Sequence, residues 1–216
     1  MQKDVLWKAG LLATIIFILG IALSVWLGNS RVDLLRQRLN ELDTYWNDVR
    51  LQGQYLDVLG KPENCNSYLE ANLDFNYNIY QEGLKIEQIE SINRFSESTI
   101  FEKQRYALLQ LQFWINSIKI KQTCDFNYYN LVYFYSHNDL SKEQEQMVQS
   151  SVLTDLKDKC GDKVMLIPIP GDLDLTSISL IIDIYGIKNL PSILIDQNVV
   201  LSGLQSKENL EKYIKC

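Results

Sequence analysis

Hydrophobic residues are concentrated near the start of the chain, in an uninterrupted stretch over residues 9–30. The stretch contains no Asp, Glu, Lys or Arg. As a helix it reaches roughly 33 Å at about 1.5 Å per residue, which is enough to cross a hydrocarbon core of about 30 Å. Trp7 and Trp26 lie near its two ends, where aromatic rings favour the membrane interface. The pattern predicts an uncleaved transmembrane signal anchor after a short tail, residues 1–8. A cleaved signal peptide is the alternative, although its apolar core is usually shorter.

Beyond the anchor, apolar residues recur in alternating steps of three and four. They are Val32, Leu35, Leu39, Leu42, Trp46, Val49 and Leu56. This spacing is typical of a helix with one apolar seam of the coiled-coil type. Such a seam needs a partner, which is either a second copy of the chain, in a homodimer through residues 32–56, or later helices of the same chain. Gly60 and Pro62 are expected to end this helix.

Two further helices are predicted before residue 125. Residues 67–92 have a helical but uneven pattern that is weakest near Gly83. Thr99 and Glu102 then form a capping-box pattern ahead of a helix with a broad apolar surface. A surface this broad is expected to be buried, so the pattern favours an antiparallel helical hairpin. Together with the seam, these helices make residues 31–124 a predicted all-α stalk.

The pattern changes at Tyr128, where a nearly continuous apolar run indicates a strand covered on both faces. A helix that ends at Gly161, a strand KVMLIPI and a helix opened by Asp172 or Asp174 follow. The strands SILID and VVLS, joined by a short turn, and a last helix SKENLEKYIKC complete the chain. The order is β-α-β-α-β-β-α, which predicts an α/β domain with parallel strands and a final hairpin over residues 125–216.

Charge and cysteine content limit the classes of function and the location that the sequence supports. A formal net charge of -6 without a basic cluster argues against nucleic-acid binding. The four cysteines are far apart and form no CxxC, and the chain has one histidine, so neither a metal site nor a cofactor is predicted. Basic residues on the two sides of the anchor nearly balance and do not decide its orientation. An even set of scattered cysteines favours structural disulfides, and therefore a C-terminal domain outside the cytoplasm. Four reduced thiols in a cytosolic domain are the alternative.

The segment IYGIKNLPSILI, residues 184–195, and the ending VVLSGLQSKENLEKYI occur within this element order. In these features, residues 128–216 resemble the thioredoxin fold. The resemblance implies that Pro191 follows a cis peptide bond and starts a strand. At the position where thioredoxins carry CxxC this chain reads SHNDLSKE. Thiol–disulfide exchange needs a thiolate, so a redox-inactive domain is expected, with Asp139 and Ser141 as helix caps.

The resemblance also implies a place for a ligand. In related proteins, the loop that carries His137 faces the proline loop, and extended peptides are held between them. The candidate binding residues are therefore His137, Asn138, Asp139, Leu190 and Pro191, where a peptide backbone could pair as an added strand. No catalytic residue is predicted, because no nucleophile or metal accompanies His137.

The same resemblance implies a disulfide pairing. The first core helix and the last helix of that fold finish at the same end of the sheet, which would bring Cys160 and Cys216 together. Cys65 and Cys124 remain, and they bracket the predicted helical hairpin. Four cysteines permit three pairings, so this pairing is one of three possibilities.

Three functions follow from these features. The first is a single-pass cell-membrane protein whose redox-inactive, thioredoxin-like domain binds a protein or peptide outside the cytoplasm. The second is a thiol oxidoreductase or isomerase that uses a displaced cysteine such as Cys124. The third is a structural subunit of a membrane complex, assembled through the apolar seam.

Overall fold

The computed structural model describes residues 11–26, residues 44, 47, 48, 50, 51, 54 and 58, and residues 64–216. Residues 11–26 are helical. Within the described residues, no helix is both long and apolar enough to cross a bilayer. The predicted anchor, residues 9–30, extends past the described helix at both ends. Every apolar position of the predicted seam lies outside the described residues.

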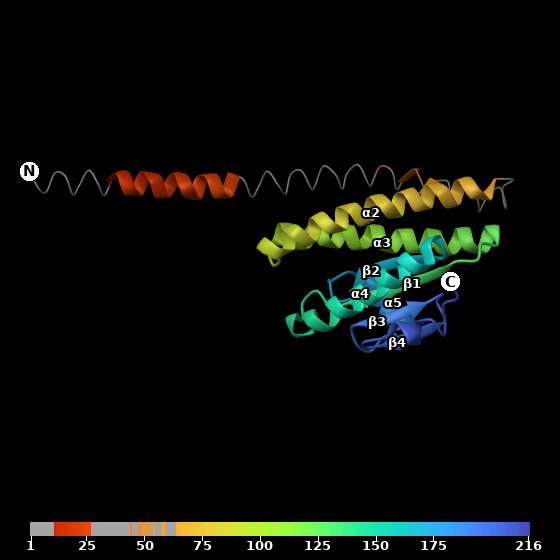
Figure 1. The fold of residues 1–216 in the computed structure, drawn as a ribbon. Coiled ribbons are helices and arrows are strands. Elements are labelled where there is room, and N and C mark those ends of the chain that lie inside the picture. The colour runs from red at the N-terminus through yellow and green to blue at the C-terminus, as the bar shows by residue number, and fades with distance from the viewer. Residues whose placement is uncertain are drawn as a thin grey trace, which may run out of the picture.

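Residues 64–216 begin with a helical hairpin of α2 (Cys65–Asn93) and α3 (Glu97–Cys124), which lie side by side (Figure 1). The unevenness predicted near Gly83 is absent, because α2 continues through it. Gly83 is where the two helices approach closely: a Cβ there would lie 2.9 Å from Cζ of Tyr106. A glycine therefore allows the Tyr106 ring to pack directly on the backbone of α2.

The hairpin turns at Ser96. Its side chain accepts a hydrogen bond from the Thr99 amide at 3.2 Å, as an N-cap does. The predicted cap at Thr99 with Glu102 was thus wrong by three residues, and both side chains are buried inside α3. At the other end of the hairpin, Cys124 forms a disulfide with Cys65, with 5.8 Å between their Cα atoms. The bond joins the first residue of α2 to the last residue of α3.

The second half of the chain is an α/β unit built on a mixed sheet. Its strands are β1 (Tyr129–Tyr135), β2 (Val164–Pro170), β3 (Ser192–Ile195) and β4 (Val199–Ser202). Their order across the sheet is β2-β1-β3-β4, with β1 and β2 parallel and the other pairs antiparallel. The helices are α4 (Glu143–Cys160), α5 (Thr176–Ile184) and α6 (Lys207–Leu210), and short 3₁₀ turns cover Leu140–Lys142 and Gly161–Lys163. The predicted order β-α-β-α-β-β-α is therefore the observed one.

Two boundaries differ from the prediction. Helix α5 begins at Thr176 rather than at Asp172 or Asp174, because the Asp172 carboxylate is used by the loop after β1. The last helix stops at Leu210, and Cys216 lies beyond it in irregular structure. Cys216 still forms a disulfide with Cys160 at the end of α4, with 4.9 Å between the Cα atoms. The two disulfides are the pairs implied by the thioredoxin resemblance.

A separate core covers each face of the sheet. One face packs against α2, α3 and α5, and the other packs against α4 and α6, as the alternation of side chains along β1 requires. Val132 and Phe134 belong to the first core, whereas Leu131 and Tyr133 belong to the second. The hairpin thus forms part of the α/β core, and the predicted boundary at residue 125 does not separate two cores.

Candidate functional site

The loop after β1 holds the predicted binding residues His137, Asn138 and Asp139, and it is tied to the loop after β2. The Asp172 carboxylate accepts hydrogen bonds from the His137 amide at 2.6 Å and the Asn138 amide at 3.0 Å. It also accepts one from the hydroxyl of Ser136. Asp139 accepts from the Ser141 amide at 3.0 Å and so caps the short 3₁₀ turn. The side chains of this loop are thus mostly engaged within the chain.

His137 is buried and faces the hairpin. Its side chain is 1% exposed, and Nδ1 lies 3.3 Å from Oε1 of Glu90 on α2. The ring of Phe95 packs edge-on against the imidazole, with 6.3 Å between the ring centroids. Among the described residues, Nε2 of His137 has no hydrogen-bond partner. Burial lowers the pKa of His137 below its usual value. The charges of Lys103 and Arg94 lower this pKa further, whereas the Glu90 carboxylate raises it. A ligand cannot reach this imidazole while the hairpin is in place.

Leu190 and Pro191, the other predicted binding residues, also have internal partners. The bond between them is cis, as the resemblance implied. Pro191 is buried, and its carbonyl accepts a hydrogen bond from the Gly203 amide at 2.8 Å. The Leu190 carbonyl accepts from Nζ of Lys142 at 2.5 Å. An added strand at this loop would find both carbonyls occupied, and only Asn138 and Asp139 of the five predicted residues are exposed.

An ion pair that the sequence analysis missed lies beside His137. Nζ of Lys103 on α3 is 2.7 Å from Oε2 of Glu90, and their side chains are 5% and 13% exposed. The same ammonium lies 5.6 Å from the centroid of the Tyr135 ring, at the end of β1. Burial disfavours the charge on Lys103, but Tyr135 and Glu90 outweigh it and raise the pKa of the lysine. This cluster fastens both helices of the hairpin to the sheet.

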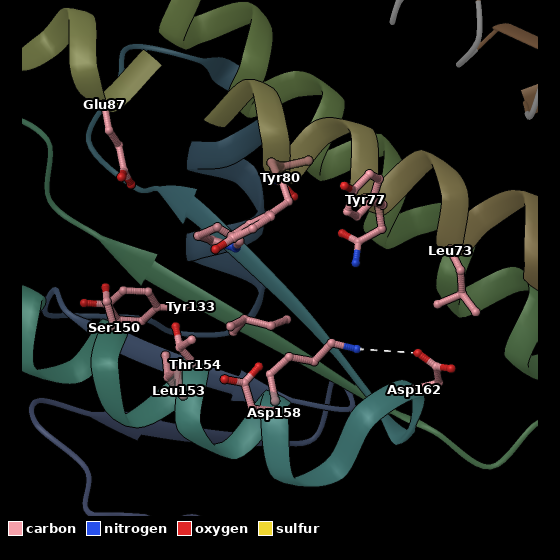
Figure 2. Close-up of a pocket in the computed structure, with 15 residues that line it drawn as sticks. Leu73, Tyr77, Tyr80, Glu87, Tyr133, Ser150, Leu153, Thr154, Asp158 and Asp162 are labelled. Carbon is pink, nitrogen blue, oxygen red and sulfur yellow. Dashed lines mark ion pairs between the residues drawn. The ribbon is translucent and has the colours of Figure 1, made fainter. Parts of the chain in front are cut away.

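The open site lies on the other side of the hairpin, between α2 and α4, over the edge strand β2 (Figure 2). It is a pocket of about 450 Å³, a volume within the range of ligand sites. Tyr77 and Tyr80, 64% and 53% exposed, line it from α2. Leu166 and Pro168 of β2 and Leu153 of α4 supply apolar surface. Exposed aromatic rings beside apolar surface are typical of an interaction site.

Charge in the pocket is predominantly negative. Three carboxylates line it, Glu87 on α2 and Asp158 and Asp162 near the end of α4, against one ammonium, Lys157. Lys157 donates to the Gly161 carbonyl at 2.7 Å and lies 3.9 Å from Oδ1 of Asp162, as the dashed line in Figure 2 marks. Burial lowers the pKa of Lys157, and the two neighbouring aspartates oppose this.

The strand edge in the pocket offers few backbone hydrogen bonds. The Gly171 amide, just past β2, donates to the Tyr135 carbonyl at 2.8 Å. Because backbone groups alternate along a strand, those of Leu166 and Pro168 point away from β1. Proline has no amide, so the outer edge of β2 lacks a donor at residue 168. A ligand in this pocket would be held mainly by side chains.

The described residues contain no cluster of His, Cys, Asp and Glu that could hold a metal ion. All four cysteines are in disulfides. No model of a known protein family matches the sequence, and no curated protein matches it significantly. The function must therefore be inferred from the site itself.

Proposed function

We propose that this chain is a membrane-anchored, redox-inactive, thioredoxin-like protein that binds a peptide segment of a partner outside the cytoplasm. The binding site is the pocket between α2 and α4, and not the surface beside Pro191. The observation that carries the proposal is the pair of exposed tyrosines, Tyr77 and Tyr80, over an apolar floor at the edge of the sheet. Tyrosines in such a place supply large contact area at a small cost in conformational entropy.

The thioredoxin-like part of the proposal is supported by topology. The element order, the mixed sheet with β1 between β2 and β3, and the cis bond before Pro191 all agree with the resemblance. The loop Ser136–Lys142 contains no cysteine. The Asp172 carboxylate accepts hydrogen bonds from this loop. These bonds favour a structural role for the loop.

The location outside the cytoplasm is supported by the cysteines. Both pairs join segments more than 50 residues apart, with sequence separations of 59 and 56. Disulfides of this kind persist in oxidising compartments. Cys124, the candidate for a displaced redox cysteine, is paired with Cys65, and this counts against the oxidoreductase alternative. The membrane anchor is supported by the charge-free run of residues 9–30.

Photo-crosslinking tests the proposal on the full-length protein in detergent micelles. Tyr80 is replaced by benzoylphenylalanine, and the protein is irradiated with a defined library of unstructured peptides. The matched control carries the probe at Tyr213, a tyrosine that is 40% exposed and does not line the pocket. We expect peptide adducts at position 80 and few at position 213. Equal labelling, or none, would contradict peptide binding.

In spheroplasts, labelling by a membrane-impermeant peptide is expected as well, and labelling only after lysis would overturn the location.

A further inference from the structure

Two carboxylates of the pocket lack an ion-pair partner in the part of the chain that the structure describes. Glu87 and Asp158 are exposed and lie in the pocket wall, and no cation of the described residues lies within ion-pair distance of either. The resident ammonium, Lys157, is turned toward Gly161 and Asp162. Figure 2 shows Glu87 and Asp158 on opposite walls, one from α2 and one from α4. The pocket therefore has, on each of two sides, a carboxylate that is in no ion pair with the described residues.

Gln110 adds a second and independent feature. It is 2% exposed and contributes to the wall of the pocket from α3. Its Nε2 donates to the Tyr106 hydroxyl at 2.7 Å. Its Oε1 has no hydrogen-bond partner among the described residues. A buried acceptor without a donor is costly, and a ligand N–H group that reached this oxygen would satisfy it.

We infer that the pocket selects a basic side chain of the bound peptide, a lysine or arginine flanked by apolar residues. The inference rests on the proposed peptide-binding function and adds the chemistry of the ligand to it. The apolar neighbours pack on Leu166 and Pro168, and the aliphatic stem of the basic residue lies along Tyr77 and Tyr80. Its cationic head is placed between Glu87 and Asp158, with an N–H directed toward Gln110. A cation near tyrosine rings gains further attraction from their π-systems.

The test compares peptides that differ at one position. Fluorescein-labelled peptides of sequence Ser-Leu-X-Leu-Ser, blocked at both ends, are titrated into the full-length protein in detergent, with X as Lys, Arg, norleucine or Glu. We expect the Lys and Arg peptides to bind about five- to tenfold more tightly than the norleucine peptide, as one weakly screened ion pair and one cation–π contact allow. The preference should fall as salt rises, and the Glu peptide should bind most weakly.

Variants of the protein sharpen the test. Asp158→Asn and Glu87→Gln should each reduce the preference for Lys over norleucine severalfold. Asp155→Asn, an exposed position on the same helix that does not line the pocket, is the matched control and should not change this preference. Gln110→Met should lower the preference as well, and a circular dichroism melt verifies that this variant is folded.

The outcomes separate the two proposals. Equal affinity for the Lys and norleucine peptides would overturn the inference and leave peptide binding in place. No binding by any peptide would remove the proposed function itself. Competition by free butylamine at the concentration of the Lys peptide would show that a small cation is sufficient, and would overturn the peptide as the ligand.

Discussion

The two sides of the helical hairpin differ in how exposed their polar groups are. On one side, the loop after β1 has its amides on Asp172, and His137 is covered by Glu90 and Phe95. On the other side, the pocket between α2 and α4 leaves tyrosines and carboxylates exposed. The same hairpin therefore buries His137, one of the predicted binding residues, and provides one wall of the pocket.

The largest expected effect is on the closed side, at Asp172. Asp172→Ala removes the acceptor for two backbone amides and the Ser136 hydroxyl. Hydrogen bonds to a charged group contribute about 1.5 to 3 kcal/mol each, so we expect a loss of about 4 kcal/mol in the free energy of unfolding. Urea unfolding followed by circular dichroism measures this. Asp174→Ala, exposed two residues later, is the control and should cost less than about 0.5 kcal/mol. A loss at Asp172 no larger than at Asp174 would mean that the loop does not depend on this carboxylate.

A smaller effect is expected at the ion pair that fastens the hairpin. Lys103→Met leaves Glu90 partly buried without its cation, and breaking a buried pair costs about 3 to 5 kcal/mol. Because Glu90 retains some exposure, we expect about 3 kcal/mol. Lys159→Met breaks a more exposed pair with Glu211, in which the two side chains are 52% and 34% exposed, and should cost about 0.5 kcal/mol or less.

The double variant Lys103→Met, Glu90→Leu should recover part of the loss, because no buried charge remains unpaired. If Lys103→Met and Lys159→Met prove equally mild, the cluster does not fasten the hairpin to the sheet.

The smallest effect concerns pH. The folded pKa of His137 is lowered by burial, so protonation favours states in which the hairpin has moved away. The neutral, buried imidazole contributes its full stabilisation at pH values above the pKa of the unfolded imidazole, about 6.5. This stabilisation is lost as the pH falls from that value toward the lower pKa of His137 in the folded protein. One proton limits the slope to about 1.4 kcal/mol per pH unit. Charges that face the ring are Glu90 from α2, Arg94 just after α2, Lys103 from α3 and Asp172 from the loop after β2.

Unfolding midpoints of the protein and of His137→Asn, measured between pH 7.5 and 5, test this prediction. The variant should show a shallower decline on acidification. His137 is the only histidine in the sequence, so its NMR titration can be followed without ambiguity. Identical pH profiles for the two proteins would contradict a buried neutral imidazole.

Much of the fold was predictable, because it depends on local patterns. The strand run after Tyr128 and the alternation of helices and strands gave the α/β order, since these segments bury apolar residues on both faces. The cap at Ser96 was missed because Thr99 and Glu102 satisfy the same motif three residues later. The short α6 was missed because its sequence favours a longer helix, whereas Cys216 is fixed at Cys160.

The pocket and the ion pair could not be predicted in the same way. Tyr77 and Tyr80 lie in the stretch whose pattern is uneven, and their exposure depends on how α2 crosses the edge of the sheet. Lys103, Glu90 and Tyr135 come from three elements, and no spacing in the sequence relates them. A Lys and a Glu on two predicted helices with apolar faces indicate a buried ion pair only weakly, because the sequence does not show that they face each other.

The Cys65–Cys124 bond has a mechanical consequence. A pull on the chain ahead of Cys65 reaches Cys124 through this covalent link, and from there it enters β1, which begins at Tyr129. Helices α2 and α3 lie on the bypassed part of the chain and carry no tension. Such a pull would thus leave this wall of the pocket in shape and pass its load to β1, which lies inside the sheet.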